Sequence, residues 1–242
     1  MPESIGATRH ETETWSILFE RQVVGLQGKA CDEFLDGVAV LGLDAEIIPT
    51  FSELGDRLEE ASGWRIDPVD GQLSGRDYWQ LIGNKRFPVV PTLRGRDELD
   101  HAREPDFFHD VFGHIPLLTH PPYSAFLRDM STIALQRIDD KTALKKIGRI
   151  YKWTIEYGLI DTPAGLRVYG AGLASSSKEI EHVFRDDVAK LPYEPRTVLL
   201  TPHTPASLQD AYFVISSFDQ LLQTFPEVEA LVFQTAQDGP LG

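Results

Sequence analysis

Apolar residues recur at helical spacing over the first part of this chain, and no alternating series of strands and helices follows them. An apolar stripe with a period near 3.6 residues is typical of a helix that packs one face against a core. Thr14 is the predicted N-cap of the first helix. The stripe comprises Trp15, Leu18, Phe19, Val23, Val24 and Leu26, and Phe34, Leu35, Val38 and Leu41 continue it. This pattern argues against a doubly wound α/β fold.

The rest of the 242 residues predicts more helices and a few short strands. Pro49, Pro68 and Gly71 interrupt the middle of the chain, which we expect to be rich in loops. Longer helices are predicted at 122–138 and 141–159, a last helix at 218–225, and strands at 166–169, 197–201 and 212–215. We therefore expect a single domain over residues 1–242 that is mainly α with a small antiparallel sheet.

The charge balance restricts the classes of partner. The chain has 23 basic and 37 acidic side chains, a formal net charge of −14. Such a surface repels phosphate groups, so we expect no nucleic-acid partner and no membrane binding. No apolar run approaches the roughly 18 residues of a membrane span, and the first residues lack a signal-peptide pattern. With one cysteine, Cys31, no internal disulfide can form, and we expect a cytoplasmic protein.

Histidines and carboxylates gather in one short segment. They are His101, His109, His114 and His120 with Glu104, Asp106 and Asp110. On a continuous α-helix five residues turn through about 500°, so His109 and His114 would face different sides. Pro105 begins a short helix here, and Gly113 and Pro116 end it, so a break at Gly113 would let the second histidine turn back. Histidine with carboxylate suits a divalent transition metal, and a solvated cluster near a helix start is the alternative.

Glu156 admits two interpretations. It lies between Ile155 and Tyr157, close to Trp153, and a carboxylate buried in such company needs a partner such as a metal. It also belongs to a polar stripe at i, i+4, i+7 and i+11, formed by Lys145, Arg149, Lys152 and Glu156. That stripe predicts a solvated helix face with a Lys152–Glu156 ion pair. Pattern alone favours the second interpretation.

Residues 167–179, RVYGAGLASSSKE, run from a predicted strand into Gly-Ala-Gly. A dinucleotide-binding loop requires a surrounding strand–helix–strand unit, which the sequence does not suggest. We therefore expect a tight turn packed beside a site, with Ser175, Ser176 and Ser177 donating hydrogen bonds there or capping a helix that ends near Arg185. The sequence has no G-x-S-x-G, C-x-x-C or H-E-x-x-H motif, which argues against a nucleophilic triad and the usual zinc sites.

Three of these segments resemble one known family. PDFFHDVFGHIPLL, YKWTIEYGLI and VYGAGLASS are similar, in this order, to motifs of the aromatic amino acid hydroxylases, which use non-haem iron and a tetrahydropterin. RIDPVDGQLSGRDYW resembles the pterin loop of the same family. The likeness covers about residues 14–220 and is greatest to the short bacterial phenylalanine hydroxylases. It implies the fold of the family's catalytic domain and, without a regulatory domain or tetramerisation helix, a monomer.

The resemblance implies that His109, His114 and Glu156 hold Fe(II). Two histidines and one carboxylate form a facial triad that leaves positions open for dioxygen, the co-substrate. On this interpretation the polar stripe around Glu156 faces a cleft rather than bulk water. The neutral imidazoles and the single carboxylate would leave residual positive charge on the iron, and second-shell partners would orient the imidazole rings.

The resemblance also implies the sites of the pterin and the amino acid. Tetrahydrobiopterin or a related tetrahydropterin would lie against the 71–78 loop and the acidic residue that follows the first histidine; these residues are Gly71, Gln72, Leu73, Ser74, Tyr78 and Asp110. Tyr78 would stack on the pterin ring. Arg94 would hold the substrate carboxylate, a bidentate task that suits a guanidinium. Ser175 would lie near that carboxylate and the iron ligands, and Gly172 in the preceding turn would border the same pocket.

The substrate wall departs from the family pattern. Lys152 stands where the phenylalanine enzymes usually have tryptophan, Trp153 follows it, and Tyr157 replaces a phenylalanine. Lys152 would point outwards, or neutralise a carboxylate of the substrate or of Glu156, or mark a substrate other than phenylalanine. His101 and Ala102 differ as well. These changes leave the iron and pterin chemistry intact and concern the identity of the substrate.

The sequence therefore predicts an oxidoreductase, a pterin-dependent monooxygenase that hydroxylates a free aromatic amino acid, with phenylalanine to tyrosine first. Hydroxylation of tryptophan at the 5-position, or of phenylalanine at the 3-position, is the nearest alternative. A catalytically silent protein that binds a pterin or an amino acid belongs to another class. A metal-dependent hydrolase is disfavoured because no zinc motif is present.

Overall fold

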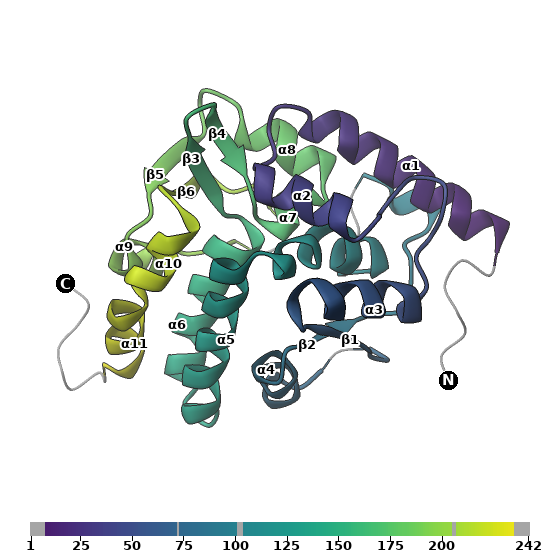
Figure 1. The fold of residues 1–242 in the computed structure, drawn as a ribbon. Coiled ribbons are helices and arrows are strands. Elements are labelled where there is room, and N and C mark those ends of the chain that lie inside the picture. The colour runs from purple at the N-terminus through teal and green to yellow at the C-terminus, as the bar shows by residue number, and fades with distance from the viewer. Residues whose placement is uncertain (1–7, 72, 101–103, 205–206, 235–242) are drawn as a thin grey trace.

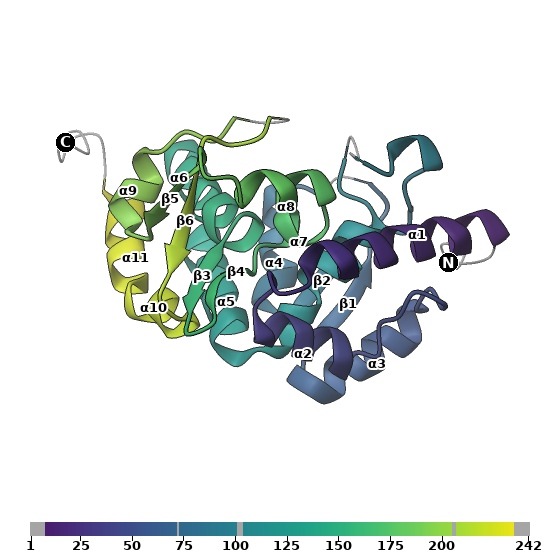
Figure 2. The ribbon, with the colours of Figure 1, turned by 90° about the horizontal axis from the view of Figure 1, so that it is seen from above.

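In the computed structural model of the protein, residues 8–71, 73–100, 104–204 and 207–234 are described (Figure 1). Helices α5 and α6 stand side by side in the middle of the molecule. Helices α1–α4 lie on one side of them, and the larger sheet with α9–α11 lies on the other. Seen from above, α1 runs along the molecule and packs against α8 (Figure 2).

Most elements are helices. The α-helices are α1 (Arg9–Leu26), α2 (Asp32–Val40), α3 (Phe51–Ser62), α4 (Gly75–Gly83), α5 (Pro121–Gln136), α6 (Lys141–Tyr151), α7 (Ala171–Ala174), α8 (Ser177–Val183), α9 (Pro195–Leu200), α10 (Phe218–Gln223) and α11 (Phe225–Phe233). The other helical segments are η1 (Arg96–Glu98), η2 (His109–His114), η3 (Pro116–Thr119) and η4 (Lys152–Glu156). The mainly α class is confirmed.

The first helix starts earlier than the sequence pattern predicted. Thr8, not Thr14, is its N-cap, because Thr8 and Glu11 form a capping box in which each side chain accepts the other's backbone N–H. Thr14 lies inside the helix, where its hydroxyl donates to the carbonyl of His10 at 2.9 Å. A helix that starts at Thr8 and one that starts at Thr14 have the same apolar stripe, so only the capping interactions distinguish the two starts.

The expectation of a loop-rich middle is wrong. Helices α3 and α4 occupy much of it, with β1 (Arg65–Pro68) and β2 (Arg86–Val89) paired in parallel between and after them. A capping box at Thr50 begins α3, and Gly63, with φ of 72°, ends it. The prolines and glycines therefore separate short elements rather than replacing them.

The larger sheet has the order β4-β3-β6-β5 and is mixed. Its strands are β3 (Leu159–Thr162), β4 (Gly165–Val168), β5 (Ala189–Pro192) and β6 (Ala211–Ile215). Antiparallel pairing, which the sequence predicted for the whole sheet, holds only for the β3–β4 hairpin; β6 pairs in parallel with both β3 and β5. The strand predicted at 197–201 is wrong, because Pro195 at the first turn starts helix α9 there.

Buried apolar side chains from α1 to α11 form one continuous cluster. Cys31 belongs to it and is fully buried. In the part of the chain that the structure describes, no helix is both long and apolar enough to span a membrane.

Candidate metal centre

The segment that carries the two histidines is a π-helix. In η2, the backbone N–H of residue i+5 donates a hydrogen bond to the carbonyl of residue i. Ile115 N, for example, donates to the carbonyl of Asp110 at 3.3 Å. This wider turn places residues five apart on one face, as an α-helix does for residues four apart. The turn itself therefore brings His114 back over His109, and the predicted break at Gly113 is unnecessary. Pro116, which has no N–H, then begins the 3-10 segment η3.

Glu156 lies on a second π-helix. Helix α6 widens at Lys152 into η4, and Tyr157 N donates to the carbonyl of Lys152 at 3.0 Å. The change of pitch takes Glu156 off the polar stripe of α6. Glu156 is 7% exposed, whereas Lys145 lies on the surface. The solvated-face interpretation of Glu156 is therefore wrong, although its ion pair with Lys152 is present.

The three side chains converge on one point. The Nε2 atoms of His109 and His114 are 3.1 Å apart. The Glu156 carboxylate lies 3.6 Å from His109 Nε2 and 3.5 Å from His114 Nε2. Ligands about 2.1 Å from an ion and at right angles to each other are about 3.0 Å apart. Among the described residues this is the one group of three or more potential metal ligands.

Protonation favours a cation at this point. Burial lowers the pKa of His109 to about 4, so the imidazole is neutral at pH 7. Burial alone would raise the pKa of Glu156, but the Lys152 ammonium and the contact with His114 outweigh it and hold that pKa below its ordinary value. The centre thus presents a neutral imidazole and an ionised carboxylate, which suit a divalent transition metal.

Ser175 determines which nitrogen of His109 is free. Its hydroxyl donates to the carbonyl of Ala171 at 2.8 Å, so the same oxygen accepts from His109 Nδ1–H, also at 2.8 Å. The Nε2 lone pair of His109 then faces the centre. His114 Nδ1 is buried and has no hydrogen-bond partner among the described residues.

Ser175→Ala is expected to weaken Co(II) binding by about 10- to 100-fold, because His109 loses the acceptor that holds its ring and its tautomer. Calorimetric titration of the metal-free protein measures this. Ser176→Ala is the matched control: Ser176 caps α8 through Glu179 N, so its loss is expected to lower the free energy of unfolding by about 1 kcal/mol and leave metal affinity unchanged. Equal metal affinities in the two variants would contradict this role of Ser175.

The Gly-Ala-Gly turn packs directly on the centre, as its sequence predicted. A Cβ on Gly172 would lie 3.2 Å from Glu156 Oε2 and 3.3 Å from Tyr157 Cε1. A Cβ on Gly113 would lie 2.8 Å from the carbonyl of Ala171. Helix α7 thus contacts both π-helices, and glycine is required where the backbones meet.

Arg94 is already paired. Its Nε donates to Asp106 Oδ2 at 2.9 Å and its Nη2 to Asp106 Oδ1 at 2.7 Å, and both side chains are buried. Asp106 Oδ1 also accepts from His109 N at 3.0 Å. Burial acts to raise the pKa of Asp106, but the hydrogen bonds and charge of Arg94 outweigh it and lower that pKa. The pair links the predicted carboxylate-binding arginine to the first π-helix.

One residue predicted to bind the pterin and the arginine predicted to bind the substrate carboxylate lie around the same cavity. Gly71 and Arg94 both line a cavity of about 450 Å³. Gln72 lies outside the described residues, Leu73 is half-buried, and Ser74 caps α4 by accepting from Asp77 N. These positions leave the backbone contacts to a pterin a prediction.

Two further residues that were predicted to bind the pterin, Tyr78 and Asp110, lie near the three converging side chains. The Tyr78 hydroxyl is 2.7 Å from that of Tyr151, whose ring lies 6.4 Å from the His114 ring. Asp110 accepts from Val90 N at 2.9 Å, and burial raises the pKa of its carboxyl to about 7. Tyr151 opens the segment YKWTIEYGLI, but no role was predicted for it from the sequence.

The predicted substrate wall divides into two parts. Trp153 is buried in the core, where its Nε1 donates to the carbonyl of Thr201 at 3.2 Å. Lys152 is 42% exposed at its side chain, and Tyr157 stacks on His203 with ring centroids 5.4 Å apart. His203 was also missed, because it lies outside the motifs and only the fold brings it beside Tyr157.

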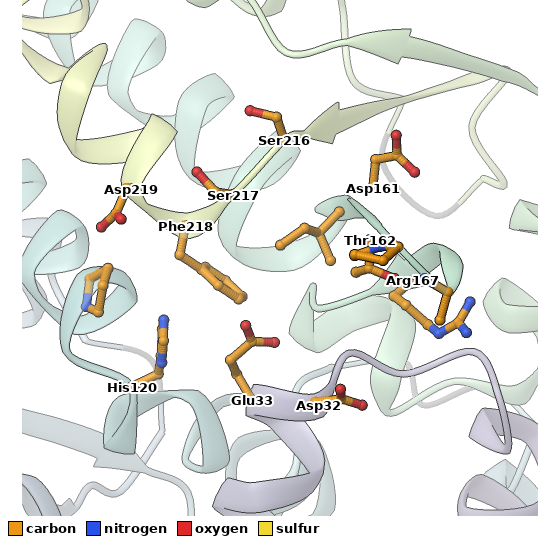
Figure 3. A pocket seen from close by; sticks show the side chains of 14 residues that line it. Asp32, Glu33, His120, Asp161, Thr162, Arg167, Ser216, Ser217, Phe218 and Asp219 are labelled. Carbon is orange, nitrogen blue, oxygen red and sulfur yellow. Dashed lines mark hydrogen bonds between the residues drawn. The ribbon is translucent and has the colours of Figure 1, made fainter.

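A separate cavity of about 370 Å³ lies between the start of α2, the β3–β4 turn and the start of α10 (Figure 3). Its labelled side chains include Glu33, His120, Arg167 and Phe218. The rings of His120 and Phe218 are 4.7 Å apart. None of the three converging side chains lines this cavity, so it is not part of the metal centre.

The sequence and the fold of the chain match known proteins. A family model described as biopterin-dependent aromatic amino acid hydroxylase matches residues 2–233. The phenylalanine-4-hydroxylase of Chromobacterium violaceum is 38% identical over 233 residues, which are 95% of this chain and 77% of that protein. The Pseudomonas aeruginosa phenylalanine-4-hydroxylase is 35% identical over 230 residues, covering 95% and 87%. The chain therefore belongs to the biopterin-dependent aromatic amino acid hydroxylases.

Solved structures agree with this assignment. The C. violaceum phenylalanine hydroxylase with bound Fe(III) superposes with a TM-score of 0.89 at 35% identity, over 96% of this chain and 86% of that one. The same enzyme bound to cobalt gives a TM-score of 0.88 over 94% and 84%, also at 35% identity. The cold-active phenylalanine hydroxylase of Colwellia psychrerythraea 34H, in its apo form, gives 0.90 at 34% identity over 98% and 90%.

Proposed function

We propose that this protein is an Fe(II)- and tetrahydropterin-dependent monooxygenase that converts free phenylalanine to tyrosine. The observation that carries the proposal is the convergence of His109, His114 and Glu156 on one point, in a chain of this family. Two imidazoles and one carboxylate leave coordination positions open for dioxygen. Relatives of this chain are named phenylalanine-4-hydroxylases, which supports phenylalanine as the substrate.

Bound iron and tetrahydropterin would supply the activation of dioxygen, and the protein would supply position and a dry environment. Ser175 holds His109 with Nε2 towards the metal position. Arg94 uses Nε and Nη2 for Asp106, so Nη1 remains to meet the carboxylate of the amino acid beside the cavity that it lines. Asp106 keeps this guanidinium fixed, which orients the substrate before reaction.

Other residues of the chain would hold the pterin and the ring. Gly71, Gln72, Leu73 and Ser74 would offer backbone groups to the pterin edge, with Tyr78 against its face and Asp110 nearby. Lys152, Tyr157 and Gly172 border Glu156 and would form the wall beside the substrate ring. Trp153 would support this wall from the core, since the centroids of the Trp153 and Tyr157 rings are 6.2 Å apart.

Anaerobic reconstitution tests the proposal. The metal-free protein is loaded with Fe(II), then mixed with tetrahydrobiopterin and air-saturated buffer, with phenylalanine, tyrosine or tryptophan in separate reactions. Chromatography and mass spectrometry are expected to show para-tyrosine that requires all of these components. An iron-loaded protein that yields no hydroxylated amino acid would contradict the proposal. Meta-tyrosine or 5-hydroxytryptophan would retain the chemistry and correct the substrate or ring position.

We place this activity in the cytoplasm, where a free and buried Cys31 stays reduced, and we expect the protein to act as a monomer. Light scattering of the purified protein measures the second expectation directly.

A further inference from the structure

Lys152 lies beside the carboxylate that belongs to the metal centre. Its Nζ is 3.8 Å from Glu156 Oε1, across one turn of η4. The ammonium is partly open to solvent, whereas Glu156 is buried. The lysine therefore reaches a buried anion from the surface.

Aromatic rings define the position of this ammonium. Lys152 Nζ lies 5.9 Å from the centroid of the Tyr157 ring, within the range of a cation–π contact. Tyr157 in turn stacks on His203, and Gly172 approaches its edge closely. Tyr157 is thus held on two sides, and Lys152 lies between its face and the Glu156 carboxylate.

In the metal-free centre the negative charge of Glu156 needs a positive partner. Glu156 is 7% exposed, so little water reaches its carboxylate, and the Lys152 ammonium approaches it to 3.8 Å. A buried carboxylate without a partner is strongly unfavourable. Lys152 supplies a positive charge at the carboxylate edge, which is the charge that a metal ion would otherwise supply.

We propose that Lys152 is a built-in counter-ion of Glu156 that stabilises the metal-free centre and weakens its affinity for divalent metal ions. This rests on the proposed role of Glu156 as a metal ligand. The lysine acts through Glu156 and through repulsion of the ion, so it is a positioning residue. The Tyr157–His203 stack keeps its ammonium close to the carboxylate.

Coulomb's law sets the scale of the effect. The Lys152 ammonium and a divalent ion roughly 6 Å away would repel each other. Even at the dielectric constant of water, this repulsion corresponds to about a tenfold change in metal affinity. We use the dielectric constant of water because Lys152 is partly exposed to solvent. Removal of the charge is therefore expected to tighten metal binding about tenfold.

Lys152→Met tests the proposal, with Lys145→Met as the matched control. Lys145 lies exposed on α6, so both variants lose one positive charge from the same helical region. Co(II) is titrated calorimetrically into each metal-free protein, without pterin or amino acid. Lys152→Met is expected to bind about tenfold more tightly than Lys145→Met. Lys152→Arg retains the charge and is expected to remain within about threefold of the unchanged protein.

Thermal unfolding provides a second measurement. Without metal, Lys152→Met is expected to melt about 2–4 °C below Lys145→Met, because Glu156 loses its counter-ion. Saturating Co(II) is expected to remove this difference. Equal Co(II) affinities of the two variants, or equal melting temperatures without metal, would overturn the proposal.

The two proposals fail in different ways. If the unchanged protein hydroxylates phenylalanine and Lys152→Met binds Co(II) no more tightly than Lys145→Met, the counter-ion role is wrong and the proposed function stands. If Lys152→Met shifts Co(II) affinity as expected but no amino acid is hydroxylated, the counter-ion role is supported and the proposed reaction is contradicted.

Discussion

Glu156→Gln is expected to abolish hydroxylation and to weaken Co(II) binding by more than about 100-fold. This exceeds the loss expected when only the hydrogen-bond partner of a metal ligand is removed, as in Ser175→Ala. The amide is neutral and of nearly the same size, so it fits beside Gly172 without a new clash. It removes the one negative charge of the three converging side chains, and the ion would then be held by neutral donors alone. Calorimetric titration of the metal-free variant and the reconstitution assay measure the two effects.

Glu181→Gln is the control for this substitution. It makes the same chemical change on the exposed face of α8, and we expect unchanged metal affinity and activity. Circular dichroism of both variants checks that the helices persist. Stoichiometric, tight Co(II) binding by Glu156→Gln would show that the metal site lies elsewhere in the protein.

Arg94→Met is expected to lower the free energy of unfolding by about 3–5 kcal/mol, because it leaves the buried Asp106 carboxylate without its charged partner. Urea denaturation at pH 7 measures the loss. Arg96→Met is the control: Arg96 pairs with Glu13 on the surface, where such an ion pair contributes at most about 1 kcal/mol. A loss for Arg94→Met no larger than that of Arg96→Met would contradict the structural role of the pair.

The same pair predicts a pH dependence. Arg94 keeps the pKa of Asp106 below its unfolded value, so the stabilisation is complete above the unfolded pKa of about 3.9 and is lost as the pH falls through the folded pKa. The difference in unfolding free energy between the unchanged protein and Arg94→Met is therefore expected to be constant near neutral pH and to shrink below about pH 4. A difference that grows with acidity would contradict this assignment.

Arg94→Met with Asp106→Leu separates the buried charge from lost packing. Replacement of a whole buried ion pair by apolar side chains is often nearly neutral for stability. We expect the double variant to recover much of the loss in urea denaturation. We do not expect it to recover phenylalanine binding, because the Nη1 donor is absent.

Long ordered motifs made the family and the residue types of the centre predictable from sequence. Histidine, carboxylate and glycine occur in the spacing of the hydroxylases, and the family match over residues 2–233 confirms the resemblance. The helices with strong apolar periodicity, such as α1 and α5, were also predictable in type. Their starts were less so, because a cap such as Thr8 depends on two side chains that meet only once the turn has formed.

The geometry of the centre depends on two π-helices that α-helical spacing does not predict. With α-helical spacing, a separation of five residues predicted that His109 and His114 face different sides. The polar stripe of α6 predicted that Glu156 faces solvent. The wider turns of η2 and η4 reverse both expectations. Such turns are retained where neighbouring segments hold them, here through the close contact of α7 with both.

By itself the sequence determined the side chains available for chemistry and the family to which they belong. Only the tertiary structure decided which of them meet: Arg94 with Asp106, Ser175 with His109, and His203 with Tyr157. These contacts join residues from 12 to 66 positions apart. Local spacing does not predict these contacts, because they form when burial of the core brings distant segments together and most buried polar groups then pair with one another.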